Sequence, residues 1–256
     1  MRVGASGILK GILGLQIVIG GLLVLGDMGP SLQGLRFSPS APRLDQPVGP
    51  GDQTRRYRPS DLPKESPGAP FPPTGDMPRR LTLSEITLDD GPALRLVGQI
   101  AAGDGARMTE TLGNRFADGA PRQVYLHSPG GSVADALELG RFLRDEDATT
   151  RIAEGDVCLS ACPYMLVGGS ERLVDDAGSV GVHQHYFGQN SVQPAFMAVE
   201  DIQRGQGQVM EYLVDMGIDP RIMRHALVTP PDEIYILLPE ELEEYGVTTP
   251  PDDRPS

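Results

Sequence analysis

The sequence predicts an α/β domain, with parallel sheets flanked by helices, in the C-terminal two thirds of the chain. Short apolar runs alternate with amphipathic stretches over residues 81–250, and a glycine turn follows one of those runs. Connections of this length imply right-handed crossovers and a mainly parallel sheet. The preceding residues, apolar at first and then rich in proline, lack this alternation. The chain therefore divides into an N-terminal segment (1–26), a linker (27–80), a folded domain (81–250) and a disordered tail (251–256).

The N-terminal segment predicts export. Residues 11–26 carry no charged side chain, and Arg2 and Lys10 precede them. A bilayer span needs about 20 apolar residues, which the run nearly reaches when it is counted from Ile8. Because the cleavage-site pattern before residue 27 is weak, we expect an uncleaved signal anchor rather than a cleaved signal peptide. The positive end should stay in the cytoplasm. In a bacterium the domain would then lie on the periplasmic side, either anchored to the inner membrane or secreted to the periplasm.

The linker predicts a spacer without a core. Residues 27–80 contain twelve of the 24 prolines and no sustained apolar run. Such a composition cannot bury enough surface to offset the entropy of the chain. Frequent proline instead favours extended, semi-stiff conformations. We expect disorder here. A role as a ligand for a proline-binding module is the less favoured alternative.

The charge distribution excludes some functions. The net charge is −13, and residues 81–256 contain twelve arginines against 29 acidic residues. Nucleic acid is therefore not an expected partner, since phosphate binding needs a basic surface. The two lysines, Lys10 and Lys64, both precede the domain. The two cysteines do not form a zinc-binding pattern, so we expect no metal and no cofactor.

The first half of the domain begins with a predicted hairpin. Residues 81–88 alternate apolar and polar, a turn signal follows at 89–91, and a second strand pattern covers 93–100. Apolar residues then recur every four positions at 108, 112 and 116, as on one face of a helix. A strand (123–127) and a further amphipathic helix (133–143) complete this half.

The second half continues the alternation. A brief strand leads to Val157, and a helix is predicted over 161–167. Later elements are strands at 172–174 and 180–183, a helix over 199–216, another helix starting at Asp219-Pro220, a strand at 235–238 and a short acidic helix at 239–245. We expect a polar loop between 184 and 193.

Three features of the domain indicate acyl-transfer chemistry. Ser160 lies where a strand pattern gives way to a helix, so free backbone N–H groups should lie beside it. The turn Ser128-Pro129-Gly130-Gly131 exposes further N–H groups without side chains in the way. His183 ends a later core strand, from which it could face the same crevice. A serine hydroxyl needs such a base to become a nucleophile, and its oxyanion needs preorganised donors.

These motifs carry a family resemblance. SPGG (128–131), GDVCLSACPYMLVGG (155–169) and VHQ (182–184) resemble the Clp protease proteolytic subunit, of the wider crotonase-like superfamily. LVGQI (96–100) and PEELEEYGV (239–247) extend the similarity to roughly residues 95–248. The resemblance implies a core of repeated strand–strand–helix units. It also implies Ser160 as nucleophile, His183 as general base, and an oxyanion hole formed by Gly131 and Ala161, with Gly130 in the same turn.

The third catalytic group is left open. The family places an aspartate before the last strand. One alignment brings Glu233 there, with Asp232 adjacent, and another brings Ile234 there, which would leave a serine–histidine dyad. A serine–lysine dyad is excluded by the lack of a lysine in the domain. Cys158 and Cys162 flank Ser160, and a disulfide that stiffens the turn or two buried thiols are both compatible with their spacing.

Two functions follow as hypotheses. The first is a serine endopeptidase that cleaves peptides or unfolded proteins through an acyl-enzyme; the second is an inactive relative that binds peptides or partner proteins in the cell envelope. Acyl-CoA chemistry is disfavoured, because CoA is cytoplasmic and the domain is expected to be exported. We expect the membrane to be contacted through the N-terminal segment. The family forms rings, so a homo-oligomer is possible, and the chain holds no ATPase segment.

The other histidines are expected to play no catalytic part. His127 and His185 should lie on the opposite strand face or in the loop. His225, beside Arg224, should lie on a solvated helix surface. Ser128 is expected to form the turn rather than to act as a rival nucleophile.

Overall fold

The computed structural model describes residues 5–27, 56–57, 70–71, 77–88, 91–185 and 195–250. The chain splits into two units. The first comprises Met1–Asp52 with Gly188–Ile202, and the second comprises Gln53–Phe187 with Gln203–Ser256. The expected tail (251–256) and much of the expected linker lie outside the described residues.

The first unit contains helix α1 (Ala5–Asp27) and the start of helix α5 (Ala195–Asp215). Helix α1 covers the apolar run that predicted export. Within the described part of the chain, the structure has no helix both long and apolar enough to span a membrane.

The second unit is built on two sheets. The five-stranded sheet has the order β2-β3-β4-β5-β7, from strands β2 (Thr82–Leu88), β3 (Gly91–Val97), β4 (Gln123–His127), β5 (Thr149–Ile152) and β7 (Glu171–Val174). Strands β2 and β3 form the predicted antiparallel hairpin, and every later neighbour in this sheet is parallel. Helices α2 (Asp104–Ala117), α3 (Val133–Asp145) and α4 (Cys162–Gly168) lie in the connections. The α/β prediction is confirmed.

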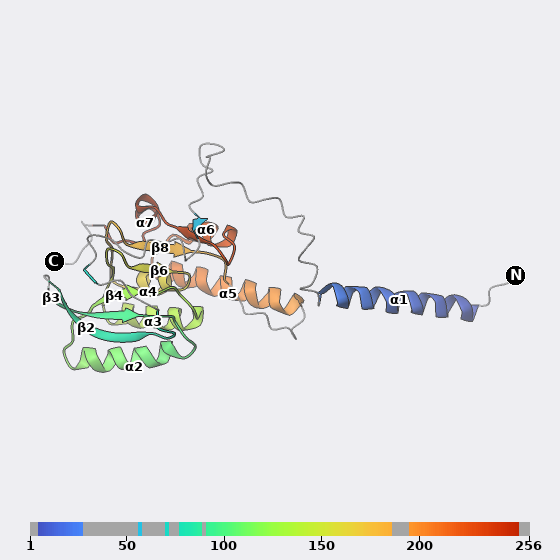
Figure 1. Ribbon diagram of the computed structural model, residues 1–256, viewed down its shortest axis with the longest axis horizontal. Helices are drawn as coiled ribbons and strands as arrows, with labels where there is room; N and C mark the ends of the chain where they lie inside the picture. The colour runs from blue at the N-terminus through green and yellow to red at the C-terminus, as the bar shows by residue number, and fades with distance from the viewer. Residues whose placement is uncertain are drawn as a thin grey trace. The chain divides into compact units, whose positions relative to one another are not determined.

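The four-stranded sheet has the order β1-β9-β8-β6. Its strands are β1 (Arg56–Tyr57), β9 (Ile234–Ile236), β8 (Ser179–Val182) and β6 (Val157–Leu159). A 3-10 turn (Pro220–Ile222) with helices α6 (Met223–Val228) and α7 (Pro239–Glu244) completes the C-terminal part. In Figure 1, α2 lies below β2, and α6 and α7 lie above β8.

The expected linker is partly ordered. Strand β1 pairs with β9, with Arg56 opposite Tyr235 and Tyr57 opposite Ile234. Phe71 packs edge-to-face on Tyr125, with ring centroids 5.6 Å apart. The prediction of disorder across 27–80 is therefore wrong at these places. A proline-rich segment can still supply an edge strand and a single aromatic anchor where the sheets leave room for them.

A buried carboxylate anchors the start of the five-stranded sheet. Asp104 is fully buried and accepts hydrogen bonds from the N–H groups of Leu81 and Ala101, both at 2.9 Å. Arg80 and Arg107 pair with the same carboxylate. Burial works against the charged form, but these bonds together lower the pKa of Asp104 to about 2.

Asp104→Asn is expected to lower the free energy of unfolding at pH 7 by about 2–3 kcal/mol, since a pKa unit corresponds to about 1.4 kcal/mol. The folded-state pKa lies below the unfolded value, so this contribution is present above about pH 4 and is lost as the pH falls toward 2. Urea unfolding of both proteins at pH 7 and pH 3 measures it. The difference in free energy of unfolding between the wild type and Asp104→Asn should be smaller at pH 3 than at pH 7. The substitution Asp118→Asn, at an exposed position, should change the free energy of unfolding little at either pH. An equal gap at both pH values would contradict the ionic role of Asp104.

Candidate active site

Ser160 lies at a sharp change of chain direction. Strand β6 ends at Leu159, and Ala161 caps helix α4. Ser160 itself has φ +62°, a left-handed conformation that costs a non-glycine residue about 1–2 kcal/mol. Its N–H donates to the carbonyl oxygen of Gly181 in β8 (2.9 Å). The serine is thus held out of both the strand and the helix, at the junction of neighbouring elements.

His183 directly follows β8 and contacts this serine. Its Nε2 lies 2.7 Å from Ser160 Oγ. Strands β6 and β8 are parallel neighbours, with Leu159 opposite Gly181, so their carboxyl ends bring the two residues together. The structure therefore places side by side the two residues that the sequence put forward as nucleophile and base.

The other ring nitrogen of His183 meets a backbone carbonyl. His183 Nδ1 lies 3.0 Å from the carbonyl oxygen of Pro231. A carbonyl oxygen only accepts, so the proton lies on Nδ1, and Nε2 offers its lone pair to the Ser160 hydroxyl. This is the tautomer that a general base needs. Asp232 is exposed, and Glu233 is partly buried. The hydrogen bond at Nδ1 is made by the main chain at Pro231, and the roles expected for Asp232 and Glu233 stay predictions.

Gln184 fixes the segment that supplies this carbonyl. Its N–H donates to Thr229 O (3.0 Å), and its side-chain amide donates to Leu227 O (2.7 Å). Thr229 Oγ1 in turn donates to His225 O (2.7 Å). The glutamine in the VHQ motif therefore holds the approach to Pro231, a role that sequence reasoning missed.

Burial sets the proton affinity of the base. It lowers the pKa of His183 below its ordinary value, against the opposing effect of hydrogen bonds to the backbone of Pro231, Glu233 and Pro230. Burial also lowers the pKa of His185, and the neighbouring His183 adds to the shift. His185 Nε2 lies 2.7 Å from the hydroxyl of buried Tyr164. His183 is thus neutral at pH 7, as a base must be before it accepts a proton.

The glycine turn connects the two sheets beside Ser160. The N–H of Ser128 donates to Val157 O (2.8 Å), and Leu159 N–H donates to Ser128 O (3.0 Å). Gly130 has φ +96°, and a Cβ at that position would lie 2.5 Å from Ser160 Cβ. Only glycine allows this approach. Ser128 is fully buried, and its hydroxyl accepts from Gly130 N (3.1 Å), which confirms that it forms the turn.

Two of the three expected oxyanion donors remain available. Among the residues described, no backbone carbonyl accepts the N–H of Gly131 or of Ala161. Gly131 is exposed, and Ala161 precedes the first turn of α4. The N–H of Gly130 is already donated to Ser128 Oγ. Gly130 therefore shapes the site rather than donating to it, and the expectation for this residue is corrected.

The open question about the cysteines has an answer in the structure. Cys158 and Cys162 form a disulfide across Ser160. Both are fully buried.

A buried polar cluster lies under the turn and was not anticipated. His127 Nδ1 accepts from the N–H of Val157 (3.0 Å), which ties the end of β4 to the start of β6. Asp156 pairs with Arg95 at 2.7 Å. Burial lowers the pKa of His127 to about 4 and raises the pKa of Asp156 to about 6. The sequence around Asp156 gave no signal of its ion pair with Arg95, because Arg95 is 61 residues away along the chain.

The prediction for His225 is wrong. Its ring stacks on Tyr235, with centroids 4.3 Å apart, and its Nε2 lies 3.0 Å from Tyr245 Oη. The side chain is 12% exposed. Its ring therefore contacts Tyr235 of β9 and Glu241 of α7 rather than solvent.

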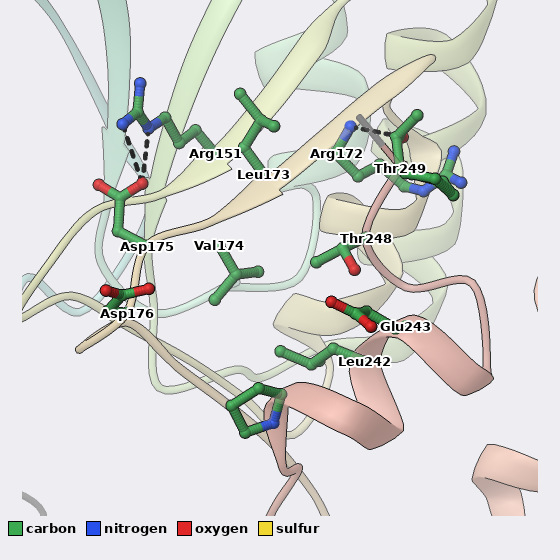
Figure 2. Close-up of a pocket in the computed structure, with 12 residues that line it drawn as sticks. Arg151, Arg172, Leu173, Val174, Asp175, Asp176, Leu242, Glu243, Thr248 and Thr249 are labelled. Atoms are coloured by element: carbon green, nitrogen blue, oxygen red, sulfur yellow. Dashed lines mark hydrogen bonds and ion pairs between the residues drawn. The ribbon is translucent and has the colours of Figure 1, made fainter. Parts of the chain in front are cut away.

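One pocket lies away from these residues. It has a volume of about 490 Å³, and Figure 2 shows β7 and α7 lining it, with the Arg151–Asp175 ion pair on one side and the Arg172–Thr249 hydrogen bond on the other. Neither Ser160 nor His183 lines this pocket. Its arginines are engaged, since Arg172 donates to the carbonyl oxygens of Gly169 and Gly246.

No family model matches the sequence, and no curated protein matches it. Among solved structures, the chain is similar to a serine-to-alanine mutant of the 1510-N membrane-bound stomatin-specific protease. The two share 17% sequence identity with a TM-score of 0.42, over 59% of this chain and 73% of that one. A similarity of this size identifies neither a family nor an activity, so the relation to the Clp proteolytic subunit stays a prediction. Any conclusion about function rests on the geometry around Ser160.

Proposed function

We propose that the protein is a serine hydrolase that cleaves peptide bonds through an acyl-enzyme on Ser160, with His183 as the general base. One observation carries the proposal: His183 Nε2 lies 2.7 Å from Ser160 Oγ while Nδ1 lies 3.0 Å from the Pro231 carbonyl oxygen. A histidine that merely filled a core would not need this tautomer. The left-handed backbone at Ser160 adds weight, because such strain is concentrated at functional sites.

The reaction follows from the positions of these groups. His183 Nε2 takes the hydroxyl proton as Ser160 Oγ attacks the carbonyl carbon of the substrate. The resulting oxyanion is stabilised by the N–H groups of Ala161 and Gly131. The imidazolium then gives its proton to the leaving amine, and water releases the acyl group by the same steps. The Pro231 carbonyl keeps the ring oriented throughout, but as a neutral dipole it stabilises the imidazolium less than a carboxylate would.

A fluorophosphonate probe tests the proposal on the purified full-length chain. We expect covalent labelling of the wild-type protein and none of Ser160→Ala. Ser128→Ala and the exposed Ser84→Ala should both remain labelled, which would identify Ser160 as the nucleophile. If the wild-type chain is not labelled, the hydrolase proposal fails, and the fold would instead serve to bind peptides or partner proteins.

The labelling rate should depend on pH through His183. Burial lowers the pKa of this residue, so the neutral form persists to lower pH than in a free imidazole. We expect the rate to level off at high pH and to fall at low pH with a midpoint below the ordinary histidine value of 6.5. Rate constants measured between pH 4.5 and 8.5 check this, with circular dichroism at each pH to confirm that the chain stays folded. An inflection at or above pH 7 would contradict the assignment.

We also propose that the domain functions outside the cytoplasm. The uncharged apolar run after Lys10 supports export, and a disulfide supports an oxidising compartment. Alkaline phosphatase is active only after export, so fusions after Leu25 and after Ser256 should both be active. Inactive fusions would contradict export.

A further inference from the structure

The disulfide encloses the nucleophile. Cys158 belongs to strand β6 and Cys162 is the first residue of helix α4, so the bond closes a short ring with Ser160 at its centre. These are the two cysteines of the chain, and neither has any exposed surface. The bond therefore acts on the backbone of the residue that the proposed function uses.

The two sides of Ser160 are held differently. On the strand side, Leu159 N–H donates to Ser128 O and Ser160 N–H donates to Gly181 O. On the helix side, the N–H of Ala161 has no carbonyl partner among the described residues. It is one of the two donors that the proposed mechanism directs at the oxyanion. On this side, the disulfide links Cys162, at the start of α4, covalently to Cys158 in β6.

Two free thiols would not fit in the same place. Unbonded sulfur atoms need more separation than bonded ones, and protein interiors are packed too tightly to supply it without movement. The backbone of Gly130 packs closely against this segment, because a Cβ at position 130 would lie 2.5 Å from both Leu159 O and Ser160 Cβ. Ser160, in the middle of the ring, has a left-handed conformation that lasts only while its surroundings fix it.

We propose that formation of the Cys158–Cys162 disulfide switches the serine on. The oxidised chain holds Ser160 against His183, and the dithiol chain does not. The inference rests on the proposed hydrolase function. In the activating step, one cysteine thiolate attacks the disulfide of a small-molecule or protein donor and forms a mixed disulfide. The first donor sulfur leaves as a thiol when this mixed disulfide forms. The second cysteine thiolate then attacks the mixed disulfide and releases the second donor thiol, so the donor disulfide gains the two electrons and two protons that the cysteines lose. A chain made in a reducing cytoplasm would stay inactive until it reached an oxidising compartment.

The test compares the two redox forms of one protein. Because the bond is buried, the full-length chain is unfolded in urea with a phosphine reductant and refolded either with the reductant or with oxidised glutathione. Thiol counting confirms each state. We expect the first-order rate constant of fluorophosphonate labelling to be at least about tenfold lower in the dithiol form, with the same final fraction labelled. Oxidation of the dithiol form should restore the rate.

A cysteine-free variant, Cys158→Ala/Cys162→Ala, separates redox control from damage to the fold. It should react at the slow rate with and without reductant, and its circular dichroism should match the wild type. Equal rate constants for the oxidised and dithiol forms would overturn the inference and leave the hydrolase proposal intact. A smaller labelled fraction at an unchanged rate constant would also overturn it, because that pattern means partial unfolding. If neither form is labelled, the hydrolase proposal falls and this inference falls with it.

Discussion

Alanine in place of His183 is expected to slow fluorophosphonate labelling of Ser160 by on the order of 10⁴- to 10⁶-fold, the range for loss of a catalytic base in serine proteases. The substitution removes the ring nitrogen that lies 2.7 Å from the Ser160 hydroxyl and would accept its proton. The fold should survive, because His183 lies after β8 and outside the apolar core. Second-order labelling rate constants and urea unfolding measure the two effects separately.

The matched variants are Asp232→Asn and Glu233→Gln. In a serine–histidine–aspartate triad, losing the carboxylate costs about 10⁴-fold. Here His183 Nδ1 already meets the Pro231 carbonyl at 3.0 Å, so we expect each substitution to cost less than roughly tenfold. A loss near 10⁴-fold in either variant would show that a carboxylate orients the histidine after all.

Gly130→Ala is expected to have the second largest effect. The added methyl group would lie 2.5 Å from Leu159 O and Ser160 Cβ, at a residue with φ +96°. Strain and overpacking together should lower the free energy of unfolding by about 2–5 kcal/mol. Labelling should also be lost, because the added methyl group would displace Ser160, the nucleophile.

Gly119→Ala provides the control for backbone strain alone. Gly119 has φ +87°, close to that of Gly130, but a Cβ there would meet nothing within 4 Å. We expect a loss of about 1–2 kcal/mol and an unchanged labelling rate. Equal losses of stability in the two variants would contradict the claim that close approach to Ser160 is what requires glycine at position 130.

The features that could be predicted from the sequence are those that depend on neighbouring residues. Alternation and turn signals located the hairpin and the strand at 123–127, and the order of the motifs brought Ser160 and His183 forward together. The role of Pro231 could not be read in this way, because every residue has a carbonyl group and only the path of the chain aims one. The pairing of Arg56 with Tyr235 was hidden for a similar reason. A two-residue strand is fixed by the edge that it covers rather than by its own composition.

The cysteine pair marks a different limit. Their spacing is compatible with a disulfide or with two buried thiols. The structure places Cys158 in β6 and shows the disulfide. His225 illustrates the opposite error, since its neighbour Arg224 suggested a solvated surface while the stacking on Tyr235 is a long-range contact.

The bond between His183 and the Pro231 carbonyl has a consequence for how such sites are recognised. The atom that orients His183 belongs to the main chain and not to a side chain. We therefore expect a mutational scan to show that substitutions at 231–233 are tolerated, whereas a triad would require an acidic residue there. The intolerance would appear instead at Gln184, whose two bonds hold the loop in place. An acidic residue at this point of the chain, such as Asp232 or Glu233, is therefore not by itself evidence of a serine–histidine–acid triad.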